Sequence, residues 1–224
     1  MVQKEPNRRP GRPRGYDPDT ALARATDAFW SAGYAATSLD DLCDATGMNR
    51  PSLYGAFGDK RALYLGALER YTEAGRRAME QALDYERPVA EALANLYSAA
   101  LALYFSGGGA ARGCFLIGTA ATEAVRNAEV RDLLGDALRE FDGCFEARLR
   151  HAQAAGELRA DADPALLAKV ASAVLHTLAL RSRAGDSRAS LRATADAAVA
   201  LICGGRSGRS AISRPSRRRS KAKR

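Results

Sequence analysis

Apolar residues recur along this chain at intervals of three and four, which is the spacing of one face of an α-helix. The clearest run lies between residues 130 and 149 and consists of Val130, Leu133, Leu134, Ala137, Leu138, Phe141, Phe145 and Leu149. No segment alternates apolar and polar residues with a period of two, and no Asn-Gly hairpin turn is present. The pattern therefore predicts an all-α protein.

Helix start and stop signals divide the first part of the pattern into elements. Asp17 precedes a proline, which predicts a capped helix over residues 18–32. Thr37 and Asp40 resemble a capping box for a short second helix, which is expected to end at Gly47. A third helix is expected over residues 50–57, and Asp59 is expected to cap a long helix that runs to about residue 84. Residues 88–104, 114–125, 130–155, 164–178 and 191–202 are expected to form the rest.

The signals also suggest how the chain is divided. We expect a basic arm at 1–16, an N-terminal helical domain with a linker helix at 17–80, a second helical domain at 81–203, and a disordered basic tail at 204–224.

The net charge of +8 is distributed unevenly along the sequence. Residues 1–15 have a net charge of +4 and residues 204–224 a net charge of +9, so the remaining body has −5. Basic arms on a mildly acidic body are typical of proteins that bind a polyanion, most often nucleic acid. The alternative is that the tails only keep the protein in solution.

Other residue patterns argue against several classes of site. None of the four cysteines lies in a C-x-x-C pair or near a histidine at ligand spacing, so neither a metal site nor a cofactor is expected. His151 and His176 are expected to be structural. No Ser-His-Asp or phosphate-loop arrangement indicates an enzyme. The lack of a secretory signal or of an apolar run of about 18 residues predicts a cytoplasmic protein with no membrane partner.

Two short helices joined by a turn at Gly47, with a helix before them, form a helix-turn-helix pattern. The second helix of such a unit lies in the DNA major groove. Its Gly55 and Ala56 are small, which lets the backbone approach DNA, and Pro51 is tolerated because first-turn N–H groups have no intrahelical partner. At the start of the preceding helix, Thr37 is expected to offer a hydroxyl and an N–H to a phosphate.

Roles for the other residues follow from their places on the second helix and, for Lys60, just after it. Tyr54 and Lys60 are expected to reach phosphates. Arg50, Ser52 and Gly55 are expected to meet base edges or thymine methyl groups. A double-stranded DNA operator is the partner that this arrangement predicts.

The segment TSLDDLCDATGMNRPSLYGAFGDKRALY resembles the DNA-binding signature of the TetR/AcrR family of bacterial transcriptional regulators. The matching elements are Thr37-Ser38, Gly47, Leu53-Tyr54, Phe57-Gly58 and Lys60. The chain departs from the pattern at Pro51 and at Gly55-Ala56, where many members carry bulkier polar residues. The resemblance implies a homodimer whose last two long helices form the interface, and a small-molecule pocket in the C-terminal domain.

The pocket is expected to take a largely apolar inducer. Its candidate lining residues are Tyr97, Leu101, Tyr104, Phe105, Cys114 and Phe115. The same residues would also suit a hydrophobic core.

Cys114 supports an alternative kind of sensing. The segment RGCFLIGTAATEA resembles one found in a subset of the family, in some members of which the cysteine senses electrophiles or oxidants. A thiol at a helix N-terminus beside Arg112 is expected to have a lowered pKa. The competing interpretation is that Cys114 is a small buried hydrophobic residue.

The sequence thus favours a DNA-binding repressor that a small-molecule inducer releases from a palindromic operator. The alternatives are an architectural nucleic-acid-binding protein that uses its basic tails and a repressor that senses redox state or electrophiles through a thiol.

Overall fold

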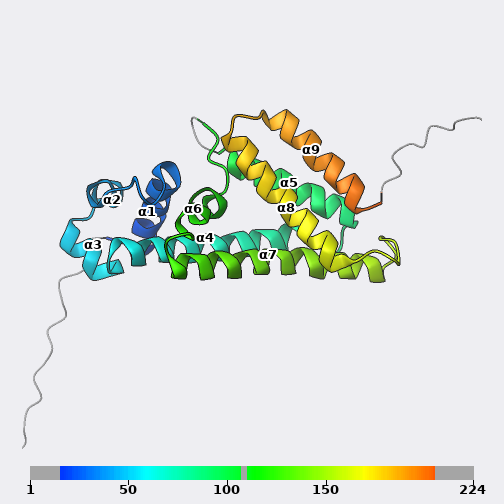
Figure 1. The fold of residues 1–224 in the computed structure, drawn as a ribbon, viewed down its shortest axis with the longest axis horizontal. Coiled ribbons are helices and arrows are strands. Elements are labelled where there is room, and N and C mark those ends of the chain that lie inside the picture. The colour runs from blue at the N-terminus through cyan, green and yellow to red at the C-terminus, as the bar shows by residue number, and fades with distance from the viewer. Residues whose placement is uncertain (1–15, 107–109, 205–224) are drawn as a thin grey trace, which may run out of the picture.

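The computed structural model describes residues 16–106 and 110–204, and all regular secondary structure within these two segments is helical. The all-α prediction is therefore confirmed. The elements are α1 (Pro18–Ala32), α2 (Leu39–Thr46), α3 (Arg50–Phe57), α4 (Lys60–Ala82), α5 (Val89–Tyr104), η1 (Leu116–Ala120), α6 (Ala121–Glu123), α7 (Ala128–Ala154), α8 (Pro164–Arg183) and α9 (Arg188–Ile202) (Figure 1). Nearly all of the basic arm and basic tail expected from the sequence lie outside the described residues.

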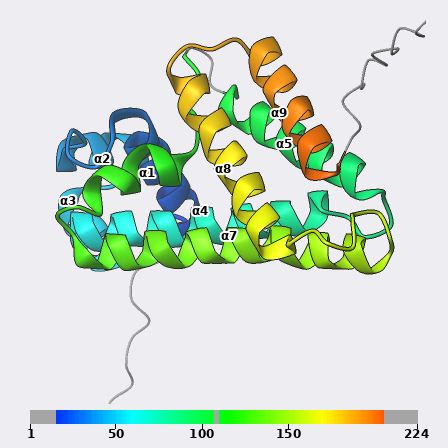
Figure 2. The same ribbon diagram turned by 45° about the vertical axis from the view of Figure 1, so that its right-hand side comes forward.

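Two long helices, α4 and α7, lie side by side along the length of the molecule (Figures 1 and 2). α1, α2 and α3 cluster at the N-terminal end of α4, whereas α5, α8 and α9 pack over the other end. α8 contacts α7, and α9 contacts both α5 and α8. α4 therefore belongs to both helical groups, and the expected domain boundary at residue 80 falls in its last turn.

Side-chain caps fix several of the helix starts. Asp17 accepts a hydrogen bond from the Thr20 N–H at the start of α1, and Asp59 accepts one from the Ala62 N–H at the start of α4. Asn49 caps α3, with Pro51 in its first turn. These caps explain why the three helices begin where the sequence predicted.

The predicted cap of α2 is wrong by one residue. Ser38, and not Thr37, caps α2, and it forms a capping box with Asp41 instead of Asp40. Thr37 is only 1% exposed, and its hydroxyl donates a 2.7 Å hydrogen bond to the Gly33 carbonyl, so it does not cap α2. An Asp in the third helical position completes the box as a Glu would.

The helix expected over residues 114–125 is not regular. It consists of the π-helical turn η1 followed by the short helix α6. This segment passes very close to α8: a Cβ atom at Gly113, whose φ is +63°, would lie 2.7 Å from the Ala179 carbonyl oxygen. A Cβ atom at Gly118 would lie 2.5 Å from Nη1 of Arg183. Two glycines thus permit the close contact with α8.

By length and composition, α8 passes the test for a membrane-crossing helix, and it is the one helix of the described segments to do so. Its mean hydropathy is 1.2, and 39% of the most apolar window is buried inside the protein. The rest of its apolar surface faces outward.

Arg148 joins two loops at the end of the molecule far from α3. Its side chain is fully buried, and its guanidinium donates hydrogen bonds to the carbonyl oxygens of Asp84 and Arg87, in the loop between α4 and α5. Glu157, in the loop between α7 and α8, lies 3.7 Å from the guanidinium and accepts a hydrogen bond from the Val89 N–H at the start of α5. A buried charge with several partners holds these segments together.

Substitution of Arg148 by methionine is expected to destabilise the fold by about 3 kcal/mol, because two loop carbonyls lose their donor and Glu157 loses its counter-charge. The matched control is Arg150→Met, which removes an exposed arginine paired with Glu146 and is expected to cost less than about 1 kcal/mol. Chemical denaturation of both variants measures the difference. Equal stabilities would show that the buried arginine does not hold the loops.

Candidate nucleic-acid interface and effector cavity

The turn between α2 and α3 is built from residues that require its geometry. Gly47 has the left-handed φ of +70° and ends α2 through a hydrogen bond from its N–H to the Cys43 carbonyl. Leu42, Met48 and Leu53 are buried beneath the turn. Their burial fixes the angle between the two helices and leaves the opposite face of α3 in solvent.

The outward face of α3 has a low, open centre. A Cβ atom added at Gly55 would meet no heavy atom within 4 Å, so packing inside the chain does not require a glycine there. Tyr54, beside it, is 45% exposed, whereas Ser52 is half-buried. A small residue next to a projecting phenol suits a surface that another molecule approaches closely.

Arg50 is held across the two helices by Asp40. Its Nη2 atom lies 2.8 Å from both carboxylate oxygens, and its Nε atom lies 3.2 Å from one of them. This hydrogen bonding raises the pKa of Arg50 above its ordinary value. Both side chains are exposed, so the guanidinium is available to an external acceptor that competes with Asp40.

The other two residues predicted at this surface differ in their availability. The Nζ atom of Lys60 lies 4.4 Å from the centroid of the Tyr34 ring, so its charge is supported by a cation–π contact at the edge of the helix-turn-helix unit. The hydroxyl of Thr37 already donates to Gly33 and is buried. Thr37 therefore holds the start of α2 in place and does not present a free hydroxyl.

An aromatic junction connects the helix-turn-helix unit to the rest of the protein. The Trp30 indole N–H donates a 3.1 Å hydrogen bond to the Arg112 carbonyl, and the Arg112 guanidinium lies 4.1 Å from the indole centroid. The same guanidinium pairs with Asp27 of α1 at 2.7 Å. Trp30 also packs edge to face on Tyr71 and against Phe115. These contacts couple α1 to the segment that leads into η1.

Beside this junction lies a cavity of about 280 Å³. It is lined mainly by apolar and small side chains from α4, α5, α7 and α8: Tyr71, Gly75, Ala78, Met79, Ala82, Leu96, Ala99, Ala100, Leu103, Tyr104, Cys114, Phe141, Leu175 and His176. Such a lining suits a small, largely apolar molecule. No cluster of three or more His, Cys, Asp or Glu side chains in the described part of the chain could hold a metal ion.

Two of the six residues predicted to line a pocket, Tyr104 and Cys114, lie at this cavity. The other four do not line it. Leu101 and Phe115 are buried in the core, Tyr97 is buried and donates a hydrogen bond to the Ala171 carbonyl, and Phe105 is half-buried beside the core. The aromatic residues were visible in the sequence, but their orientations depend on which helix they pack against.

His176 is a cavity residue that the sequence analysis treated as structural. Its Nε2 atom is buried and has no hydrogen-bond partner among the described residues, and burial lowers its pKa below the ordinary value. A neutral imidazole with a free nitrogen can bond a polar group of a bound molecule. The signal that could have located this cavity is the small-residue face of α4, where Gly75, Ala78 and Ala82 recur at three and four.

The predicted lowering of the Cys114 pKa is wrong. Cys114 is 7% exposed, and its burial raises the pKa of the thiol. The Arg112 guanidinium that was expected to lower it faces Trp30 and Asp27 instead. The Tyr71 hydroxyl donates a hydrogen bond of 3.3 Å to the sulfur. Cys114 is thus a buried thiol in a mainly apolar setting.

In the native protein at pH 8, Cys114 is expected to react with iodoacetamide at least about tenfold more slowly than the more exposed Cys43, because burial reduces both its access and its thiolate fraction. Mass spectrometry of the peptides measures both rates. In guanidinium chloride the two rates should converge. A Cys114 that reacts first in the native state would restore the interpretation of an activated thiol.

Comparisons with known proteins cover both helical groups. A family model described as bacterial regulatory proteins, tetR family, matches residues 21–67. A second, described as tetracyclin repressor-like, C-terminal domain, matches residues 89–198. Together the two matches include the helix-turn-helix unit and most of α5 to α9.

Several relatives are similar over most of their length. The HTH-type transcriptional repressor ComR of Escherichia coli K12 is 33% identical over 178 residues, which is 79% of this chain and 84% of ComR. The repressor BdcR of the same strain is 37% identical over 117 residues, which is 52% of this chain and 59% of BdcR.

Solved structures agree with these relationships. A cysteine mutant of the TetR family regulator CifR, complexed with 26-bp double-strand operator DNA, is 35% identical with a TM-score of 0.73, over 84% of this chain and 98% of CifR. The reduced form of E. coli NemR, at 18% identity, has a TM-score of 0.71 over 83% of this chain and 94% of NemR, and shares the fold. Because family models match both halves of the chain, this protein belongs to the TetR family of bacterial transcriptional regulators.

Proposed function

We propose that this regulator is a homodimeric repressor that binds a palindromic DNA operator through α3 and leaves it when a small, largely apolar molecule enters the cavity. The observation that carries the DNA assignment is the outward face of α3, where the open position at Gly55 lies beside the exposed Tyr54, in the same helix as the exposed arginine at its start. A surface of this kind admits the backbone close to base edges. The operator complex of the related CifR supports the same role.

The residue roles divide into two groups. Arg50, Ser52 and Gly55 read base edges, with Arg50 exchanging Asp40 for an acceptor on a base. Tyr54 and Lys60 contact phosphates, which fix position without carrying sequence information. Each group has a distinct signature in binding experiments.

The outer faces of α8 and α9 provide the surface for a second copy. On α8, exposed or half-buried residues recur at four and three and form one stripe: Leu166, Val170, Ala173, Thr177 and Leu180. On α9, small or apolar exposed residues form another: Ala189, Ala193, Ala197, Ala200 and Leu201. Small residues let helices approach closely, so the four helices of two copies can bury this apolar surface. The proposal assigns the outward surface of α8 to a partner subunit and not to a membrane.

Release of DNA follows from the position of the cavity. A molecule bound there contacts Tyr71 of α4 and Cys114. Cys114 lies two residues after Arg112 in the sequence. Arg112 in turn is stacked on Trp30 of α1. Displacement of this segment would shift α1 and α4 together and change the distance between the two α3 helices of the dimer.

The alternatives have less support. An architectural binder would depend on the basic tails, whereas the helix-turn-helix unit explains DNA binding from the body of the protein. A thiol switch at Cys114 is opposed by the raised pKa of that thiol. We infer that the protein acts in the cytoplasm, where its operator is, and that it is not an enzyme.

Replacement of Arg50 or Ser52 by alanine is expected to change which bases are preferred, because each lost base contact removes about 1–3 kcal/mol of discrimination. Tyr54→Phe is expected to weaken binding to all sequences by about fivefold, because one phosphate hydrogen bond is lost. Selection of binding sites from a random pool, followed by titration, measures both. Tyr85→Phe, at another exposed tyrosine far from α3, is the control. Unchanged base preference in both alanine variants would contradict the assignment.

Replacement of Leu180 by glutamate is expected to convert the dimer to a monomer at micromolar concentration and to weaken operator binding by more than about tenfold, because a charge would be buried in the interface. Val125→Glu makes the same change at a site that is 81% exposed between α6 and α7, and should remain dimeric. Sedimentation equilibrium decides between the two states. A monomeric wild-type protein would refute the dimer outright.

A further inference from the structure

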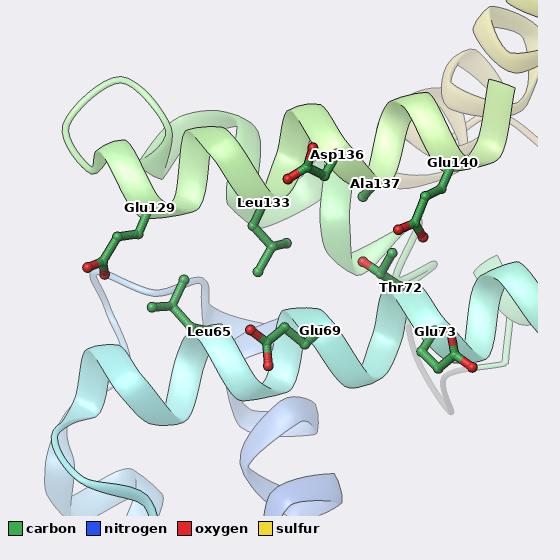
Figure 3. Close-up of a pocket in the computed structure, with 9 residues that line it drawn as sticks. All are labelled: Leu65, Glu69, Thr72, Glu73, Glu129, Leu133, Asp136, Ala137 and Glu140. Carbon is green, nitrogen blue, oxygen red and sulfur yellow. The ribbon is translucent and has the colours of Figure 1, made fainter. Parts of the chain in front are cut away.

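A second hollow lies on a different face of α4 from the effector cavity. It is a groove of about 620 Å³ between α4 and α7, shown in Figure 3. Its lining residues are Leu65, Glu69, Thr72, Glu73, Glu129, Leu133, Asp136, Ala137 and Glu140. None of them lines the effector cavity, so the two hollows are separate sites.

Five of the nine lining residues are acidic, and they differ in whether a cation already neutralises them. Glu73 pairs with Arg76 and Arg77, Glu129 with Arg61, and Asp136 with Arg139. No arginine, lysine or histidine of the described segments lies within 4 Å of Glu69 or Glu140 in an ion pair. The groove therefore retains two exposed carboxylates that have no cationic partner among the described residues, one on each helix.

Thr72 provides an independent sign that a ligand group is missing. It is 8% exposed, and its hydroxyl oxygen is buried without a hydrogen-bond partner among the described residues. In Figure 3 this hydroxyl lies between the two helices, with Glu69 on one side and Glu140 above it. A buried hydroxyl left without a partner is unfavourable, and a bound donor would relieve that cost.

The shape of the charge distribution restricts the ligand. The described residues contain no group of three carboxylates close enough together to hold a metal ion. The acidic residues instead follow the length of the groove, and Leu65, Leu133 and Ala137 lie between them (Figure 3). Separated positive charges joined by short aliphatic spacers match this alternation of carboxylates and apolar contacts.

We propose that the groove between α4 and α7 binds a linear aliphatic polyamine, with ammonium groups at Glu69 and Glu140, one of them also bonded to the Thr72 hydroxyl. The methylene spacer between these two ammonium groups passes Ala137, and the part of the ligand beyond Glu69 lies on Leu65 and Leu133 (Figure 3). The site adds a cationic ligand to the apolar effector of the main cavity.

The position of the groove also gives polyamine binding an effect on DNA, and this part rests on the proposed function. At the end of the groove nearer α3, Arg61 of α4 pairs with Glu129 of α7 at 3.5 Å, and Lys60, the residue before Arg61, begins α4. A ligand that draws the acidic faces of α4 and α7 together would fix the angle of α4 below the helix-turn-helix unit. It would thereby favour one of the two dimer geometries.

Calorimetric titration of the full-length protein with spermidine, without DNA and at 150 mM NaCl, tests the site. Glu69→Gln/Glu140→Gln is expected to weaken binding at least about tenfold, because two charge-assisted contacts are lost. Glu86→Gln/Glu91→Gln removes the same charge from residues outside the groove and should bind as the wild type does. No binding by the wild type, or equal weakening in both double variants, would overturn the proposal.

Thr72→Val separates a ligand group from a structural one. The valine removes an unpartnered buried hydroxyl, so the melting temperature should stay the same or rise, while spermidine binding should weaken several-fold. A variant that melts lower and binds normally would contradict the role of Thr72. Mg²⁺ at equal concentration should not displace spermidine. Full displacement would show that the groove only attracts cations non-specifically, and it would overturn the proposed polyamine site.

Titration of operator binding with spermidine, in the wild type and in the Glu69→Gln/Glu140→Gln variant, tests the regulatory part. Spermidine also binds DNA directly, but that contribution is equal for both proteins. A larger response in the wild type is expected, and equal responses would overturn the link to DNA. If neither protein binds any operator, the proposed function fails, while the DNA-free calorimetry still decides the site.

Discussion

The stacking of Arg112 on Trp30 is the contact on which the joining of the two helical groups depends. Arg112 lies only two residues before Cys114, at the wall of the effector cavity, and Trp30 is buried in α1. The indole N–H fixes the backbone of Arg112, and Asp27 fixes its guanidinium, so this segment cannot shift without moving α1. The aromatic rings of Tyr71 and Phe115 fill the space around the indole, which makes the junction rigid.

α4 extends this coupling because it has three functional surfaces. Its first half packs Tyr64 against Phe29 of α1, and Tyr64 is also hydrogen-bonded to Thr119 of η1. Its small residues border the effector cavity, and its acidic residues border the groove toward α7. In the proposed function α4 would receive an apolar signal at the effector cavity and a cationic one at the groove. Two residues separate the end of α3 at Phe57 from the start of α4 at Lys60, so both signals would reach α3.

The sequence predicted most of the local structure and little of the tertiary arrangement. Helix class, the bounds of α3 and the caps at Asp17 and Asp59 follow from local hydrogen bonding, which the spacing of residues determines. The cap of α2 was misplaced because Thr37 and Ser38 have equal capping chemistry, and only burial distinguishes them. Three features depend on contacts between helices that are distant in sequence: the irregular η1 segment, the orientation of the pocket aromatics and the burial of Cys114. The spacing of apolar residues along the chain does not predict such contacts.

Because the space around Gly55 is open, the DNA contacts of this position and the stability of the fold can change independently. A Cβ atom at this position would meet no heavy atom of the described residues within 4 Å, so an alanine there would leave the core of the helix-turn-helix unit undisturbed. Its φ lies outside the left-handed region, so other residues can adopt the same backbone conformation. Changes at residue 55 would therefore alter DNA contacts without weakening the fold. Descendants of this regulator could acquire new target sequences through this position while every intermediate remains a folded protein.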